Sequence, residues 1–127
     1  MTRFRWLLLF VSLSSAALAQ KPAEEPPEED VSLLPKTDYV LNPLQAAKEI
    51  KVGNYYFKKG SYNAALRRYE ESVKWDPNSA EGWYKLGETS AKLGDQKTAR
   101  NAWTKYLELE PDGKNAAAVK KRLNSKS

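Results

Sequence analysis

The chain contains neither cysteine nor histidine among its 127 residues. Without cysteine it can form no disulfide bond and has no thiol nucleophile, and the usual zinc ligands are missing as well. Carboxylate chemistry remains available, but the sequence shows no glycine-rich loop of the kind that cradles phosphates. We therefore expect a protein that is not an enzyme, with no catalytic residues, no metal site and no cofactor.

Long apolar runs are scarce too, and the clearest is WLLLFVSL at residues 6–13. Arg3 and Arg5 precede it, and Ala17 and Ala19 stand where a signal peptidase requires small residues. These features predict a signal peptide at residues 1–19 and a mature chain that begins at Gln20. Export to the periplasm or the extracellular space follows, with no stable membrane span after cleavage. An uncleaved anchor is the alternative, although a bilayer span needs about 20 apolar residues.

Charge is divided unevenly along the chain. Residues 20–45 hold two basic and six acidic side chains, a net charge of −4, whereas residues 46–127 hold 17 basic and 10 acidic ones, a net charge of +7. Prolines and carboxylates predict an extended linker for QKPAEEPPEED at residues 20–30, which could also fold back onto the basic part. Leu33 to Leu41 are apolar enough to dock on the first helix. The basic part indicates a solvated helix surface or an acidic partner, and we expect no nucleic acid partner for an exported protein.

The remainder of the sequence predicts helices, because no β-branched alternation is sustained. The predicted helical segments are residues 46–59, 62–75, 80–93, 96–109 and 114–124. Asn42 and Pro43 have the types preferred at the N-cap and first position of a helix. Asn78 and Glu81 have the spacing of a capping box, and Asp95 is placed to cap the fourth helix. The predicted fold class is all-α.

The chain aligns with itself when Gly53 is placed on Gly87. In that register, identical residues meet at Ala46/Ala80, Lys51/Lys85, Gly53/Gly87, Lys58/Lys92, Gly60/Gly94, Ala65/Ala99 and Pro77/Pro111. The pattern resembles the tetratricopeptide repeat, a unit of about 34 residues in which W-x2-L-G-x2-Y is followed by alanine, an aromatic residue and proline. The second copy has Trp83, Leu86, Gly87, Ala99, Trp103 and Pro111, and the first has Val52, Gly53, Tyr56, Ala65, Tyr69 and Pro77. Glu49 and Ser90 depart from the pattern where tryptophan and tyrosine belong.

The resemblance implies a short α-solenoid of helix-turn-helix repeats. A signal peptide (1–19) and a linker with a docking segment (20–45) would precede a domain at residues 46–127, with repeats at 46–79 and 80–113 and a capping helix at 114–124. Gly53 and Gly87 are expected to face Ala65 and Ala99, with Tyr69 and Trp103 filling the space alongside. Either the stretch from Tyr39 to Leu41 or another subunit is expected to cover the open end at the first helix.

The resemblance also implies a groove lined by the first helix of each repeat. The groove positions are Ile50, Lys51, Asn54, Phe57, Lys58, Tyr84, Lys85, Glu88 and Lys92. Phe57 and Tyr84 beside lysines would make suitable anchors for a peptide that carries a carboxylate. The alternatives are that Phe57 belongs to the core and that the lysines form a solvated face. Relatives that clamp a C-terminal carboxylate use five positions, here Ile50, Asn54, Lys85, Asn115 and Val119, of which only Asn54 matches in full.

As the resemblance implies, the expected function is non-catalytic binding of a protein or peptide, as a scaffold in the bacterial periplasm or cell envelope. A homo-oligomer is the alternative, a structural protein that self-associates by stacking its exposed repeat ends. In a third interpretation, the acidic linker occupies the basic groove until a partner displaces it.

Overall fold

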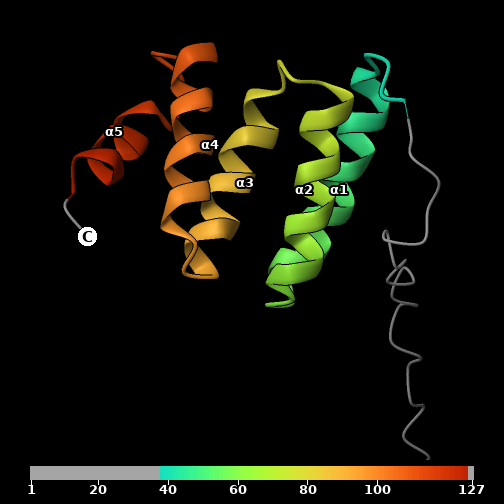
Figure 1. The fold of residues 1–127 in the computed structure, drawn as a ribbon, viewed down its shortest axis with the longest axis horizontal. Coiled ribbons are helices and arrows are strands. Elements are labelled where there is room, and N and C mark those ends of the chain that lie inside the picture. The colour runs from blue at the N-terminus through green and yellow to red at the C-terminus, as the bar shows by residue number, and fades with distance from the viewer. Residues whose placement is uncertain (1–37, 126–127) are drawn as a thin grey trace, which may run out of the picture.

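The computed structural model describes residues 38–125 and contains five helices within them. These are α1 (Pro43–Lys58), α2 (Tyr62–Trp75), α3 (Ala80–Lys92), α4 (Gln96–Leu109) and α5 (Ala116–Asn124). Figure 1 shows α1 and α2 as one antiparallel hairpin beside the hairpin of α3 and α4, with α5 inclined against α4 at the far end. The all-α repeat architecture is confirmed. The predicted signal peptide at residues 1–19, the predicted acidic linker at residues 20–30, Leu33 and Leu34 lie outside the described residues.

Local sequence explains where the helices begin and turn. Asn42 is the N-cap of α1, with its Oδ1 accepting a hydrogen bond from the Gln45 amide at 3.0 Å, and Pro43 is the first helical residue, both as predicted. Gly60 and Gly94 follow α1 and α3 with φ values of 76° and 79°, a left-handed conformation that glycine adopts without strain. Asp95 caps α4 through the Thr98 amide at 3.0 Å.

Two predicted helix starts need correction. Ser79, not Asn78, is the N-cap of α3, and its Oγ accepts from the Gly82 amide at 3.2 Å. The Asn78 amide instead donates to Asp76 Oδ1 at 3.0 Å, so Asn78 belongs to the preceding turn. Helix α5 begins at Ala116 rather than residue 114, because a turn occupies the residues before it.

The two glycines on the first helices lie against aromatic rings. A Cβ atom added to Gly53 would come within 2.6 Å of the Tyr69 ring, and one added to Gly87 within 2.5 Å of the Trp103 ring. The expectation that Tyr69 and Trp103 fill the space beside these glycines is therefore confirmed. Close packing against a large buried ring outweighs the cost of about 1 kcal/mol for glycine in a helix.

The hairpins join through small residues on α2 and α3. A Cβ atom on Gly82 would lie 2.7 Å from Ser72 Oγ and 3.0 Å from Val73, so the two helices approach closely there. Trp83 packs against the hydrophobic clusters of both hairpins, and its Nε1 donates to the Pro77 carbonyl at 2.7 Å. Trp83 thus links the two hydrophobic clusters across the joint between the hairpins.

Helix α5 closes the far end of the stack. Ala116 and Val119 are buried against Ala99, Trp103 and Tyr106 of α4, as expected for a capping helix. Two cationic side chains support it, because Arg122 lies over the Trp103 ring at 4.7 Å and Arg100 donates to the Leu123 carbonyl at 2.7 Å.

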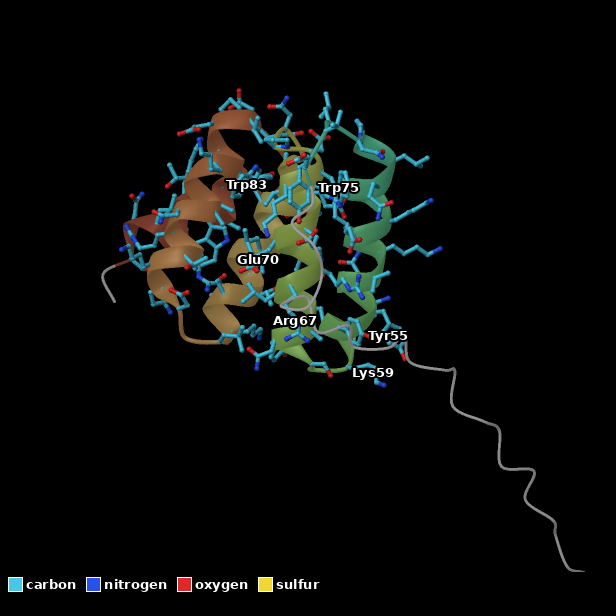
Figure 2. All side chains as sticks on the ribbon, turned by 45° about the vertical axis from the view of Figure 1, so that its right-hand side comes forward. Tyr55, Lys59, Arg67, Glu70, Trp75 and Trp83 are labelled. Atoms are coloured by element: carbon cyan, nitrogen blue, oxygen red, sulfur yellow. The ribbon has the colours of Figure 1, made fainter. Side chains whose placement is uncertain are left out.

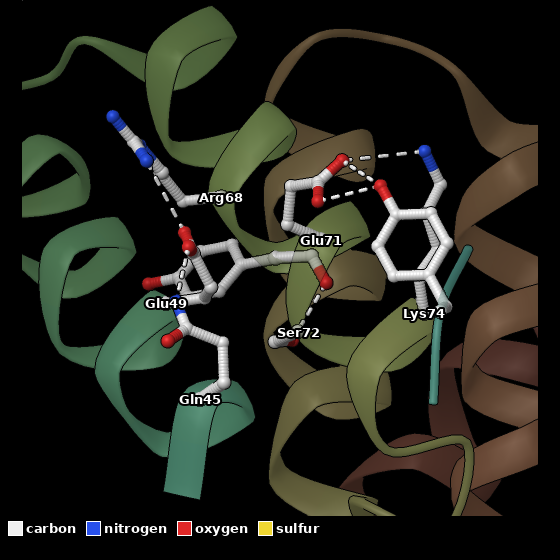
Figure 3. Close-up of polar contacts among 8 residues, drawn as sticks. Gln45, Glu49, Arg68, Glu71, Ser72 and Lys74 are labelled. Carbon is white, nitrogen blue, oxygen red and sulfur yellow. Dashed lines mark hydrogen bonds and ion pairs between the residues drawn. The ribbon is translucent and has the colours of Figure 1, made fainter. Parts of the chain in front are cut away.

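The N-terminal segment does not cover α1 as expected. Tyr39 packs edge-on against Trp75 of α2, with ring centroids 4.9 Å apart, and donates to the Glu71 carboxylate. Val40 and Leu41 remain exposed. Polar side chains of α1 contact one another and α2 near this segment. Glu49 accepts a hydrogen bond from Gln45 and forms an ion pair with Arg68 of α2 at 3.3 Å (Figure 3).

Candidate peptide-binding cavity

A cavity of about 470 Å³ lies where both hairpins meet the α4–α5 loop. Its lining comes from four parts of the chain: Asn54 of α1; Ala80, Glu81, Tyr84 and Lys85 of α3; Tyr106 of α4; and Glu110, Lys114 and Asn115 of the following loop. Both repeats and the capping segment therefore contribute to one site.

Two tyrosines form the aromatic wall. The Tyr84 and Tyr106 rings are tilted against each other with centroids 5.5 Å apart. Tyr106 is buried, and its hydroxyl accepts a hydrogen bond from the Asn115 amide at 3.1 Å, which holds the loop against α4. Burial and the nearby Glu88 carboxylate raise the pKa of Tyr84, so its phenol stays protonated and can donate.

The polar groups of the cavity include both signs of charge. Tyr69 donates to Asn54 Oδ1 at 2.6 Å, which leaves the amide nitrogen of Asn54 to donate toward a ligand. Lys85 is partly buried, with Nζ 5.7 Å from the centre of the Phe57 ring, so its cation sits between the hairpins. Lys114 adds a second cation, and Glu81 and Glu110 add two carboxylates. The site offers donors and acceptors around an aromatic wall.

The structure brings three of the nine predicted groove residues to this cavity, namely Asn54, Tyr84 and Lys85. Ile50 was predicted to line the groove, but it is only 7% exposed and belongs to the core of the first hairpin. Phe57 is partly buried and packs edge-on against Tyr62, with centroids 5.2 Å apart. The remaining predicted residues lie outside the cavity lining: Lys51, Lys58, Glu88 and Lys92.

The predicted groove did not include the two lining residues that follow the second repeat. Lys114 and Asn115 stand one repeat period after Ala80 and Glu81, so extending the repeat into the capping segment would have indicated them. Tyr106 stands one period after Ser72, a small residue where α2 and α3 meet. Its equivalent in the first repeat therefore does not indicate that Tyr106 lines a cavity.

Residues 38–125 include no group of three or more acidic side chains placed to hold a metal ion. In the same part of the chain, no helix combines the length and apolar character that crossing a bilayer requires.

Comparisons with known proteins agree with this geometry. Residues 53–94 match a family model described as TPR repeat, and residues 80–112 match one described as tetratricopeptide repeat. Stress-induced-phosphoprotein 1 of Caenorhabditis elegans is 52% identical over 40 residues, which cover 32% of this chain and 12% of that protein. Superkiller complex protein 3 of Homo sapiens is 32% identical over 63 residues, 50% of this chain and 4% of that protein.

A third relative, Hsp70-Hsp90 organizing protein 3 of Arabidopsis thaliana, is 30% identical over 71 residues, which cover 56% of this chain and 13% of that protein. The chain thus spans a small fraction of each relative, and the likeness concerns the repeats. Two family matches, the repeat period and the paired helices all agree. Residues 53–112 are thus tetratricopeptide repeats, a kind of repeat that serves as a protein–protein interaction module.

Proposed function

We propose that this module binds a peptide segment of a partner protein in the cavity between its hairpins. The observation that carries the proposal is the composite lining, in which Asn54, Tyr84 and Lys114 come from the first repeat, the second repeat and the capping segment. A peptide in this cavity would contact all three units at once. Aromatic side chains beside cations are the groups that anchor peptides in many interfaces.

The lining favours a partner segment with at least one carboxylate. Lys85 and Lys114 supply the cations, and the Asn54 amide and the Tyr84 phenol supply neutral donors. Glu81 and Glu110 can accept from the backbone amides of the peptide or pair with a basic residue beside the carboxylate. This mixture favours a short acidic motif over a long acidic tract.

The name of the Arabidopsis relative describes an organiser of Hsp70 and Hsp90. Clamping the C-terminal carboxylate of such a chaperone is not the mode that we propose here. Two of the five clamp positions hold Ile50 and Val119, which are 7% and 1% exposed and carry no charge. We therefore propose that the ligand is an internal or terminal acidic motif bound by Lys85 and Lys114, rather than the C-terminal tail of a chaperone.

The test is a pair of charge reversals on the full chain, Lys85→Glu in the cavity and Lys97→Glu on exposed α4. Each changes the net charge equally. Partners are captured from extract on each protein, and circular dichroism checks that both variants fold. Loss of a partner with Lys85→Glu alone supports the cavity. Retention by both variants, or loss by both, would argue against it.

Self-association through the repeat ends is the alternative, and the α1 face bears on it. At the joint between the hairpins, Gly82 permits the close approach of α2, whereas the repeat register places Lys48 at the equivalent position of α1. Glu49 likewise stands where Trp83 joins the hairpins. A second copy could not pack on α1 as α3 packs on α2 without burying these charges. We expect a monomer in sedimentation velocity, and a concentration-dependent dimer would favour the alternative.

An exported location, in the bacterial periplasm or cell envelope, is part of the proposal. Its support is the sequence of residues 1–19, with Arg3 and Arg5 before the apolar run and Ala17 and Ala19 after it. N-terminal sequencing of the protein recovered from cells tests this placement. A chain that begins at Gln20 supports cleavage and export, whereas one that begins at Met1 would point to a retained anchor or to no export.

A further inference from the structure

Exposed apolar side chains gather at the start of the described chain. Within residues 38–125, five large apolar side chains are exposed, and four of them lie between residues 39 and 44. Val40, Leu41 and Leu44 are 73%, 63% and 69% exposed, and we call these three the N-terminal ridge. None of them lines the cavity. Such a concentration on a small soluble surface indicates an interaction site.

The ridge is held in place by its neighbours. Tyr39 donates to both Glu71 carboxylate oxygens at 2.8 and 2.7 Å, and its ring packs edge-on against Trp75. On the other side of Val40 and Leu41, the Asn42 amide donates to the Trp75 carbonyl at 2.9 Å. Because both ends of the segment are fixed on α2, Val40 and Leu41 are presented outward, and little ordering entropy opposes docking.

Lysines continue the ridge along α1. Leu44, Lys48 and Lys51 are spaced i, i+4 and i+7, so they form one stripe on the helix, and both lysines are exposed. Figure 2 shows nitrogen-tipped side chains projecting from α1 away from the other helices. Lys74 adds a cation 5.6 Å from the centre of the Tyr39 ring.

Within residues 38–125, the acidic groups near the ridge are Asp38, Glu49 and Glu71, and Glu71 offsets the charge of Lys74. Glu49 is paired with Arg68, and Glu71 is engaged by Tyr39 and Lys74, with Lys74 Nζ 3.4 Å from its carboxylate. Asp38 is exposed at the start of the segment. The result is an apolar ridge bordered by cations, which is the arrangement that binds the interface of an anionic bilayer.

We propose that the N-terminal ridge docks on the surface of a bilayer that contains anionic lipids. Val40, Leu41 and Leu44 enter the headgroup boundary, while Lys48 and Lys51 contact lipid phosphates. A second copy is a poorer occupant, because a twofold contact centred here would bring the same lysines together.

The absence of cysteine makes a direct test possible, since one introduced cysteine is a unique labelling site. The full chain carries an environment-sensitive fluorophore at Leu41→Cys, with Leu93→Cys as the control at an exposed leucine outside the ridge. Each protein is mixed with vesicles of phosphatidylcholine alone or of phosphatidylcholine with phosphatidylglycerol. We expect a blue shift, and quenching by nitroxide-labelled lipid, for the position 41 probe on anionic vesicles only.

This readout separates the ridge from the N-terminal apolar run. If residues 6–13 alone bind the vesicles, the protein will sediment with them while the position 41 probe keeps its aqueous spectrum, and the proposal fails. Failure to sediment at all also overturns it. A blue shift without vesicles that grows with protein concentration would show that a second copy covers the ridge, which overturns the proposal as well.

A charge variant adds a second measurement in the labelled protein. Lys48→Glu with Lys51→Glu should weaken partitioning on anionic vesicles by at least about tenfold, because two attractions to anionic lipid become repulsions. The matched control is Lys97→Glu with Lys105→Glu on α4, which changes the net charge equally. Equal weakening by both pairs would show a general charge effect and contradict docking through the ridge.

Discussion

The two hairpins share one contact and differ in what surrounds it. In each, a glycine of the first helix accepts an aromatic ring of the second, Gly53 with Tyr69 and Gly87 with Trp103. Both rings are almost completely buried. The Tyr69 hydroxyl donates to Asn54, whereas Trp103 Nε1 has no partner among the described residues. The shared contact holds the repeat together, and the polar partner is an addition made in one copy only.

A second difference lies on the helix faces that meet the next element. Position 56 is tyrosine and position 72 is serine in the first repeat, whereas the equivalents in the second are Ser90 and Tyr106. Ser72 is small, so α3 can approach α2 at Gly82. Tyr106 is large and reaches the α4–α5 loop, where it forms a wall of the cavity. Both copies of the repeat therefore keep the contact between glycine and an aromatic ring. They differ on the face of the second helix, which packs against α3 in the first copy and lines the cavity in the second.

The largest effect is expected where the shared contact is overfilled. Gly87→Leu places a side chain where even a Cβ atom would lie 2.5 Å from the Trp103 ring. We expect the free energy of unfolding to fall by about 3 kcal/mol, because a well-packed core cannot accommodate the added side chain without strain. Urea denaturation measures it. Gly53→Leu should lose a similar amount against Tyr69. A loss confined to one hairpin would mean that the two contacts are not equivalent.

The next prediction separates the hairpins by their polar groups. Tyr69→Phe removes the hydroxyl that donates to Asn54 and should lower the free energy of unfolding by about 1 kcal/mol. Ser90→Ala removes a buried hydroxyl without a partner among the described residues, so it should be neutral or slightly stabilising. Thermal and urea unfolding compare the two. A destabilisation by Ser90→Ala as large as that by Tyr69→Phe would contradict the difference between the copies.

Helix caps offer a comparison with a single kind of substitution. Ser79 Oγ accepts from the Gly82 amide at the start of α3, whereas Ser61 at the start of α2 makes no such bond. Ser79→Ala should cost about 1 kcal/mol and Ser61→Ala only a few tenths, because only Ser79 satisfies a free amide. Both values come from urea midpoints at an unchanged m-value. A reversed order would contradict the cap assignment.

The fold could be predicted from sequence because repetition doubles each weak signal. Gly53 and Gly87, or Pro77 and Pro111, are ambiguous alone but convincing when the same period separates both pairs. The N-cap at Ser79 was missed because Asn78 is an equally good cap by type. Only the turn geometry, in which the Asn78 amide bonds Asp76, assigns the role to its neighbour.

The site was less predictable than the fold. Tyr84 and Lys85 follow from the repeat, but Ile50 was wrong because side-chain direction depends on how the helices cross. Lys114 and Asn115 line the cavity from the turn before α5, whereas the equivalent residues of the first repeat already lie in α3. Tyr39 was expected to pack on α1 with its apolar neighbours. Instead its hydroxyl donates to Glu71 and its ring packs against Trp75, both on α2.

The smallest expected effect concerns the N-terminal segment, which has no counterpart ahead of the second hairpin. Burial, together with the hydrogen bond to Glu71, raises the pKa of Tyr39 from 10.0 to about 12. The folded state thus favours the neutral phenol, so this contribution is complete below pH 10 and is lost as the pH rises through about 12. Tyr39→Phe should cost about 0.5 kcal/mol at neutral pH, since the bond is solvent-exposed.

Urea unfolding of both proteins at neutral pH and between pH 10 and 12 tests this dependence. Tyr69 and Tyr84 also have raised pKa values, because both are partly desolvated by burial, but they titrate in both proteins. The difference between the two proteins therefore isolates Tyr39, and it should shrink as the pH rises. A difference that stays constant would mean that the ring contact with Trp75, rather than the hydroxyl, holds the segment on α2. The segment would then be held by that aromatic contact together with the hydrogen bond from the Asn42 amide to the Trp75 carbonyl.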